Sequence, residues 1–216
     1  DLIKKETLSF IKKAYPSIKI AQWFLDRMDS DWKYNKKRFL DKIDYVDCSF
    51  CTTAPDILKF PKKNKVFYIP NPVDDSFENL NIDKKKYFKN DVFFAMSHGV
   101  HRGYLKKGKF DLREKFIDKL IKKTPNIKYD LYGLKNIQPI WADNFKDAVS
   151  NSKMGLNLSQ GKSTKYYSSD RITQLIANGL LTFIDKKTQL NDFFNNDEVI
   201  FYNSLKDLAN KITKYS

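Results

Sequence analysis

The stretch from Ser152 to Asp185 constrains the fold of this chain more than any other. It opens with a short apolar run over 154–158, which reads as a buried strand, and continues into a polar loop. Ser168 and Ser169 are favourable N-cap residues for a helix with apolar side chains at helical spacing, and Gly179 ends that helix before a second apolar run. A polar loop between a strand and a helix N-terminus is where open α/β sheets bind anions.

Strand-like and helix-like segments alternate along the rest of the chain. The patterns predict strands over 18–25, 45–53, 65–69, 91–96, 127–132, 154–158, 181–185 and 198–202. They predict helices over 2–14, 33–43, 112–122, 141–151 and 189–194, a short one from Pro55, and a last one from Leu205. Such alternation is typical of an α/β fold with parallel sheets covered on both faces.

A polar, proline-punctuated stretch separates two sets of these units. We place a Rossmann-like N-terminal domain at 1–74, a linker at 75–90 and a Rossmann-like C-terminal domain at 91–216, with the last helix packing back on the N-terminal domain. The N-terminal set has few strands, and the chain opens directly into a helical pattern without a starting Met. We therefore expect an incomplete N-terminal domain and a sequence that is a fragment.

Composition narrows the partners and the compartment. The net charge is +14, but 35 of the 40 basic residues are scattered lysines and only five are arginines, so the composition does not favour nucleic acid as a partner. No apolar run is long enough to span a bilayer, and the N-terminus lacks the apolar core of a signal peptide. Two cysteines provide no disulfide framework. We expect a cytoplasmic protein with at most peripheral contact with the inner membrane.

Three polar loops follow strands of the C-terminal set, at Ser97–Gly103, Tyr132–Gln138 and Ser159–Asp170. Right-handed crossovers bring such loops to one edge of a sheet. In the first loop, Gly99 and Gly103 permit close backbone approach. Hydrogen-bond donors to a phosphate or sugar hydroxyl are supplied by His98, His101 and Arg102. The alternative is a plain connecting loop.

The third loop holds a denser set of polar groups. Ser168, Ser169 and the first helical amides are suited to an oxyanion, and Asp170 to a ribose or sugar hydroxyl. A diphosphate would be neutralised by Lys165 or Arg171. The neighbouring Tyr166 and Tyr167 suggest lining or stacking. The alternative is a well-capped helix with tyrosines packed at the sheet edge.

Other kinds of site find little support. Cys48 and Cys51 lie three apart in a strand-like run, where they point to opposite faces, and the spacing of His98 and His101 is not that of a zinc finger. The sequence has no P-loop, no Gly-x-Gly-x-x-Gly fingerprint and no nucleophile elbow. We expect neither a bound metal nor a nicotinamide or flavin cofactor.

The motifs YIPNPVDDSF, SHGVHRG, YG and the 152–185 stretch together resemble those of GT-B glycosyltransferases, in particular the bacterial group related to spore-maturation-type enzymes. The resemblance spans nearly the whole chain and implies two Rossmann-like domains facing each other across a cleft. It implies a nucleotide-diphosphate sugar in the C-terminal domain and a glycan, lipid or protein acceptor at the N-terminal one. Such enzymes usually need no metal, since basic side chains and helix amides stabilise the leaving diphosphate.

The resemblance also implies which residues bind the donor and which one catalyses. Gln160 departs from the pattern, because a basic residue is expected there, so the charge would come from Lys162 or Lys165. The candidate for the catalytic base is Asp26. Alternatives are a non-catalytic nucleotide-binding fragment and a basic nucleic-acid-binding α/β protein. The predicted donor-binding set is Ser97, His98, Gly99, His101, Arg102, Gly103, Tyr132, Gly133, Gln160, Gly161, Lys165, Tyr166, Tyr167, Ser168, Ser169, Asp170 and Arg171.

Overall fold

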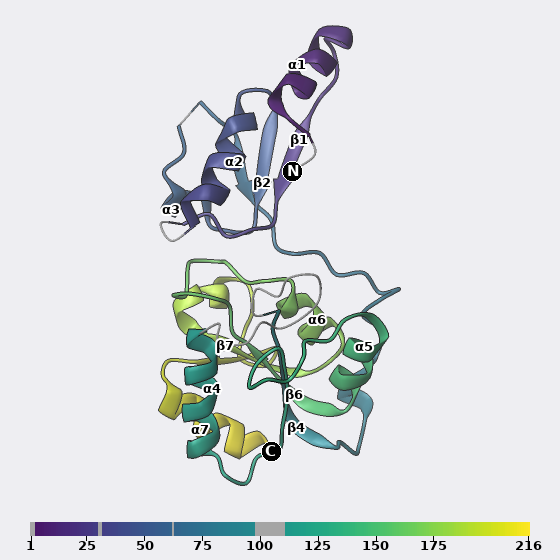
Figure 1. Cartoon of the computed structure of the whole chain (residues 1–216), viewed down its shortest axis with the longest axis vertical. Helices are drawn as coiled ribbons and strands as arrows, with labels where there is room; N and C mark the ends of the chain where they lie inside the picture. The colour runs from purple at the N-terminus through teal and green to yellow at the C-terminus, as the bar shows by residue number, and fades with distance from the viewer. Residues whose placement is uncertain (1–2, 30–31, 62, 98–110) are drawn as a thin grey trace. The chain divides into compact units, whose positions relative to one another are not determined.

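The computed structural model describes residues 3–29, 32–61, 63–97 and 111–216, in two compact units (Figure 1). The first unit contains residues 1–71 together with 164–169, and the second contains 72–163 and 170–216. Both units are built on parallel sheets, so the predicted α/β class is confirmed. The six residues Thr164–Ser169 are a departure from the predicted domain 91–216, because they group with the first unit.

The first unit has a three-stranded sheet in the order β1-β2-β3. Its strands are β1 (Ala21–Phe24), β2 (Cys48–Cys51) and β3 (Val66–Tyr68), and its helices are α1 (Lys5–Ala14), α2 (Lys33–Ile43) and α3 (Pro55–Leu58). Each element lies where the sequence patterns predict it, but the strands are shorter than the apolar runs that contain them.

The core of the first unit lies on the sheet face covered by α2 and α3. Phe39 of α2 is fully buried and packs edge-on against Phe24 of β1, with ring centroids 5.9 Å apart. Cys51 of β2 and Leu58 of α3 join the same cluster. Burial alternates along β2, with Cys51 buried and Cys48 only partly covered, as expected of residues three apart in a strand.

The second unit has a five-stranded parallel sheet in the order β5-β4-β6-β7-β8. Its strands are β4 (Asn90–Ala95), β5 (Tyr129–Tyr132), β6 (Ser152–Asn157), β7 (Leu181–Asp185) and β8 (Ile200–Tyr202). β5 follows β4 in the chain and pairs with one edge of it, and the next strand, β6, pairs with the opposite edge of β4. The strand order therefore reverses between β4 and β6, and in such sheets the crevice at the carboxyl ends of these two strands is the usual ligand site.

Helices cover both faces of this sheet. On one face Val92 and Phe94 of β4 pack with α4 (Leu112–Lys123) and α7 (Leu205–Tyr215), which lie side by side (Figure 1). On the other face Phe93 packs with α5 (Ala142–Ser150) and α6 (Arg171–Ala177). The last helix thus lies within the second unit and packs on α4, which differs from its expected packing on the N-terminal domain.

Two further segments differ from the predictions. In place of the helix expected over 189–194, the structure has the short 3-10 turn η4 (Leu190–Asp192), which follows another such turn, η3 (Lys186–Thr188). Part of the predicted linker 75–90 is integral to the second unit: Ile82, at the start of the 3-10 turn η2 (Ile82–Lys84), is 1% exposed, and its amide donates to the Asn178 carbonyl at 2.9 Å. Sparse apolar residues among lysines concealed this packing in the sequence.

Candidate functional site

Arg171 joins the carboxyl ends of the two strands at the switch point. Its Nε donates to the carbonyl oxygen of Ala95, at the end of β4, at 2.8 Å, and its Nη1 donates to that of Leu158, just after β6, at 3.1 Å. The guanidinium lies over the Phe94 ring, 5.1 Å from its centroid, and the residue is 9% exposed. A residue predicted to neutralise a diphosphate therefore directs two of its donors at the backbone of the sheet.

The glycine of the YG motif is explained by packing at the neighbouring strand end. The Met96 amide donates to the Tyr132 carbonyl at 3.0 Å, which draws the ends of β4 and β5 together. Gly133 has φ +76°, and a Cβ atom there would lie 1.6 Å from the Met96 carbonyl oxygen. Only glycine fits such a position. Tyr132 is half-buried, and its pKa is raised first by burial and then by the nearby Asp130 carboxylate.

Of the first predicted loop, only its first residue belongs to the described part of the chain. Ser97 is exposed, two residues beyond the end of β4. The loop residues His98, Gly99, His101, Arg102 and Gly103 lie outside the described residues.

The first half of the third loop lies at the carboxyl ends of β6 and β7. Gln160, Gly161 and Lys162 are exposed there. The loop is anchored by the Ser163 hydroxyl, which donates to Asp185 Oδ2 at 2.6 Å at the end of β7. Exposed groups of this stretch therefore follow the carboxyl end of β6, one of the two strands at the switch point.

The helix after this loop is capped differently from the prediction at its start and as predicted at its end. The N-cap residue of α6 is Asp170, which has helical backbone angles and makes no side-chain cap hydrogen bond. Ser168 is 4% exposed and its hydroxyl donates to the Ser169 carbonyl, so the prediction of serine caps is wrong. At the other end Gly179 has φ +85°, and its amide donates to the Ile176 carbonyl at 2.9 Å.

The second half of the loop, Thr164–Ser169, which we call the crossing segment, follows the carboxyl edge of the first unit's sheet. Three of its backbone carbonyls accept hydrogen bonds in the order of the strands. That of Lys165 accepts from the Ala54 amide after β2 at 3.2 Å, and that of Tyr166 from the Tyr68 hydroxyl of β3 at 3.4 Å. That of Ser168 accepts from the Asn71 side-chain amide at 3.2 Å. The segment thus occupies the edge where an open α/β sheet offers its ligand site.

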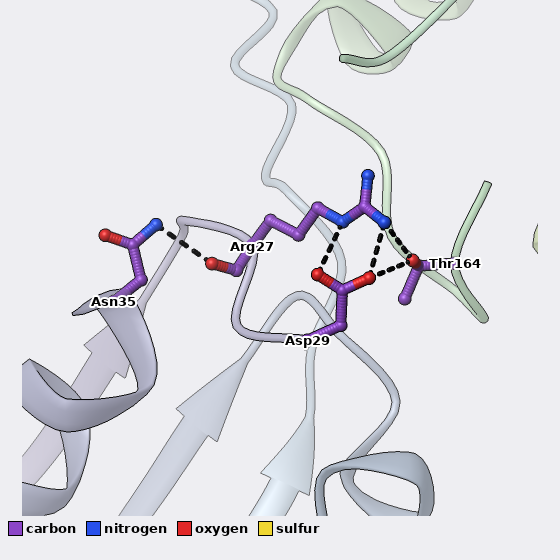
Figure 2. Close-up of polar contacts among 4 residues, drawn as sticks. All are labelled: Arg27, Asp29, Asn35 and Thr164. Atoms are coloured by element: carbon purple, nitrogen blue, oxygen red, sulfur yellow. Dashed lines mark hydrogen bonds and ion pairs between the residues drawn. The ribbon is translucent and has the colours of Figure 1, made fainter. Parts of the chain in front are cut away.

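At the start of the crossing segment, Thr164 meets a buried ion pair after β1 (Figure 2). Arg27 is 3% exposed; its Nε donates to Asp29 Oδ1 at 2.9 Å, and its Nη2 pairs with Asp29 Oδ2. The Thr164 hydroxyl accepts from Arg27 Nη2 at 2.6 Å and donates to Asp29 Oδ2 at 2.6 Å. The Asn35 side chain donates to the Arg27 carbonyl at 2.9 Å. We call Arg27, Asp29 and Thr164 the clasp.

The charged and aromatic residues of the crossing segment also have partners in the first unit. Lys165 Nζ lies 2.5 Å from Asp56 Oδ2, and this hydrogen bond lowers the pKa of Asp56. The Tyr166 ring lies 5.0 Å from that of Tyr68, whose pKa burial raises to about 12. Tyr167 lies 5.9 Å from the Arg27 guanidinium carbon. Lys165, Tyr166 and Tyr167, predicted to bind the donor, therefore pack at the carboxyl edge of the first unit.

Asp26, the proposed catalytic base, lies next in the sequence to Arg27 and close to Asp29, two residues that the sequence analysis did not identify. Asp26 is exposed, and its Oδ2 atom lies 3.9 Å from Nη1 of Arg38. Arg27 and Asp29, directly after it, were not singled out from the sequence. The sequence feature that could have identified them is an arginine beside acidic residues just after a predicted strand, in a chain with only five arginines.

Neither a cluster of metal-ligating side chains nor a membrane-spanning helix is found among the residues that the structure describes. No group of three or more His, Cys, Asp or Glu side chains there is placed to hold a metal ion. The Cys51 thiol donates to the Thr53 carbonyl at 3.1 Å, and burial raises its pKa to about 11. Within the same residues, no helix combines the length and the apolar character needed to cross a bilayer.

Comparison with known proteins bears on the second unit most directly. Residues 113–216 match the family model described as "Glycosyl transferase-like". This is the region from α4 to the end of the chain, and it includes the exposed loop at the switch point. No curated protein matches the chain.

Two solved structures share the fold. One is an alpha-glucosyltransferase in complex with UDP and a 13-mer DNA containing a central A:G mismatch, with a TM-score of 0.58 and 14% identity over 97% of this chain. The other is the Glycosylation Associate Protein (Gap123) complex from Streptococcus agalactiae, with a TM-score of 0.52 and 10% identity over 99% of this chain. This chain spans 64% and 46% of the length of those two chains. The likeness confirms a GT-B-like α/β fold.

Proposed function

We propose that this chain is all or part of a cytoplasmic glycosyltransferase of the spore-maturation-related bacterial group. It would transfer a sugar from a nucleotide-diphosphate donor to a glycan, lipid or protein in surface polysaccharide or glycoconjugate synthesis. The observation that carries this proposal is the match of residues 113–216 to a glycosyltransferase-like family model. The UDP named for a protein of similar fold supports a nucleotide donor.

The donor site is assigned to the crevice at the carboxyl ends of β4 and β6. Ser97, Gln160 and Asp170 are exposed in the chain that follows these two strands. In this proposal the Asp170 carboxylate accepts a hydrogen bond from a ribose or sugar hydroxyl. The exposed Lys162 neutralises charge on the leaving diphosphate, as lysine does in other phosphate sites, so that no metal is needed. The bond between the anomeric carbon and the diphosphate oxygen breaks as the acceptor hydroxyl oxygen attacks that carbon, and the diphosphate leaves with the bonding electrons. The acceptor hydroxyl gives its proton to a general base, for which Asp26 is the candidate.

Thermal unfolding with a panel of UDP, GDP, TDP and their sugars tests this proposal. A ligand at 100 times its Kd stabilises the folded state by about 2.7 kcal/mol, which raises Tm by several degrees in a chain of this size. We expect Asp170→Asn to lose most of this shift. The matched control is Asp143→Asn, which removes another exposed carboxylate from a helix N-terminus. Absence of a shift with every nucleotide would overturn the assignment.

A second measurement separates an enzyme from a binding fragment. A catalytically competent chain slowly hydrolyses its donor, so free nucleoside diphosphate accumulates when the acceptor is omitted. Nucleotide binding without any such release would identify this chain as a donor-binding portion of a longer enzyme.

A DNA acceptor is the second candidate. It is favoured by the DNA in one complex of similar fold and by the net charge of +14. The charge is not concentrated, however, because the first unit holds 16 of the 40 basic and nine of the 26 acidic residues. A labelled 13-mer duplex titrated at two salt concentrations tests it, since phosphate contacts weaken steeply with salt.

A further inference from the structure

The clasp contains one of two buried ion pairs among the described residues, the other being Arg113 with Asp111. The Arg27 side chain is 3% exposed and that of Asp29 is 16% exposed, whereas most of the other ion pairs described are substantially open to solvent. A buried guanidinium is costly unless a carboxylate neutralises it and its other donors are satisfied. Two-pronged pairing with Asp29 meets the first condition, and the Thr164 hydroxyl contributes to the second.

Arg27 and Asp29 hold the crossing segment through hydrogen bonds to the Thr164 side chain. Its hydroxyl is acceptor and donor at once, with both contacts at 2.6 Å, and the residue is 8% exposed. Further along the segment, three backbone carbonyls accept hydrogen bonds that any residue could accept, and the side chains there make an exposed ion pair and ring contacts. A hydroxyl at position 164 is therefore a specific requirement of the clasp.

We propose that Arg27 and Asp29 are positioning residues that act through Thr164. They fix the crossing segment, and with it Tyr166 and Tyr167, in the conformation needed to bind a nucleoside diphosphate. This role rests on the proposed function, because the tyrosines serve a nucleotide only if the chain binds one. Tyr166 supports a fixed conformation, since its φ of +61° is costly for a residue with a side chain and persists only where surrounding contacts hold it.

Hydrogen exchange of the crossing segment tests the clasp without reference to any ligand. Thr164→Val removes the hydroxyl while keeping the shape, and Thr164→Ser keeps the hydroxyl. We expect about tenfold faster exchange of the amides of 165–169 in the valine variant, the factor for loss of one buried hydrogen-bonding group, and near-normal exchange in the serine variant. Unchanged exchange in Thr164→Val would overturn the proposal.

A matched control shows whether any effect is specific to the segment. Thr124 is another buried threonine, 2% exposed, whose hydroxyl donates to the Leu120 carbonyl at 2.9 Å and shares a hydrogen bond with the Tyr129 hydroxyl at 2.7 Å. Thr124→Val should lower Tm without changing exchange over 165–169. Asp29→Asn, which keeps the size of the side chain, serves as a second clasp variant if Thr164→Val folds poorly.

Titration with UDP gives the functional readout. We expect the Kd for UDP to rise about tenfold in Thr164→Val, and to stay near the original value in Thr164→Ser and Thr124→Val. Equal or tighter UDP binding by Thr164→Val would refute positioning and indicate instead that the segment obstructs a ligand. If the unaltered protein binds no nucleotide, the proposed function fails and the nucleotide role of the clasp fails with it, while hydrogen exchange still decides whether the clasp holds the segment.

Discussion

The backbone of Gly133 packs so closely against the Met96 carbonyl that no side chain would fit at position 133. A Cβ atom on Gly133 would lie 1.6 Å from the Met96 carbonyl oxygen, and the glycine backbone has φ +76°. The contact brings the end of β5 against the end of β4, next to the proposed donor crevice. Gly133 is thus required for the packing of the β5 end against the β4 end, independently of any ligand.

Gly133→Ala should therefore be among the most damaging small substitutions in this protein. The left-handed backbone costs an alanine about 1–2 kcal/mol, and the clash adds an overpacking cost of about 1–3 kcal/mol. Gly161→Ala is the matched control, because Gly161 has nearly the same φ, +78°, but lies exposed in a loop. Urea unfolding should show a much larger loss for Gly133→Ala; equal losses would mean that the contact with Met96 relaxes easily.

Arg171→Lys should destabilise the second unit even though it preserves the charge. A lysine ammonium cannot reproduce the two directed hydrogen bonds to the Ala95 and Leu158 carbonyls. A buried acceptor left without its partner costs about 1–3 kcal/mol. The measurement is the free energy of unfolding in urea.

Its control is Lys153→Arg, a charge-preserving exchange on the partly exposed β6 residue next to the buried Met154. If Arg171→Lys keeps full stability but weakens UDP binding, then Arg171 contacts the diphosphate directly and is not primarily a link between strands. The two outcomes thus separate the predicted ligand role from the observed structural one.

Regular elements were predictable because their determinants are local. Apolar runs bounded by proline, glycine and asparagine located every strand, and Gly179 was correctly identified as a helix end since its left-handed backbone follows directly from residue type. The serine caps failed for a reason that is not local. Ser168 groups with the first unit, where its carbonyl accepts from Asn71, and Asp170 stands at the N-cap position of α6.

The clasp and the crossing segment could not have been predicted in the same way. Arg27 and Thr164 are 137 positions apart, and nothing in either local sequence specifies the other. The polar, aromatic character of 164–169 suits both a ligand loop and a segment laid on a sheet edge, and only the three-dimensional contacts distinguish the two. The first loop, from His98 to Gly103, lies outside the described residues, so its predicted role stays a prediction.

The two cysteine thiols should differ sharply in reactivity. Cys51 is fully buried with a pKa of about 11, whereas Cys48 is partly exposed. Only the thiolate reacts with iodoacetamide, so at pH 8 we expect Cys48 to be alkylated and Cys51 to stay protected until the protein unfolds. Mass spectrometry of Cys48→Ser and Cys51→Ser variants assigns the site. Rapid labelling of Cys51 in the folded protein would contradict its burial.

The raised pKa of Cys51 also predicts a loss of stability at alkaline pH. The unfolded thiol, with a pKa of 9.0, releases its proton before the folded one does, so the unfolded state gains stability as pH rises from about 9 to 11. This contribution is fully present below pH 9. Cys51→Ala should flatten the decline in Tm over that window, and Cys48→Ala, as the control, should not.

The contact between Lys165 and Asp56 gives a prediction at acid pH. Lys165 holds the pKa of Asp56 below 3.8, so the pair stabilises the crossing segment above that pH and loses its effect as pH falls through the lowered pKa. Asp56 is largely exposed, so the contribution is at most about 1 kcal/mol and weakens with salt. Asp56→Asn should lower Tm slightly at pH 7, and this difference should shrink as pH falls below 3.8, while Asp75→Asn, an exposed aspartate outside this contact, should not change Tm over this range. A difference between the original protein and Asp56→Asn that does not shrink in acid would show that hydrogen bonding, and not charge, holds Lys165.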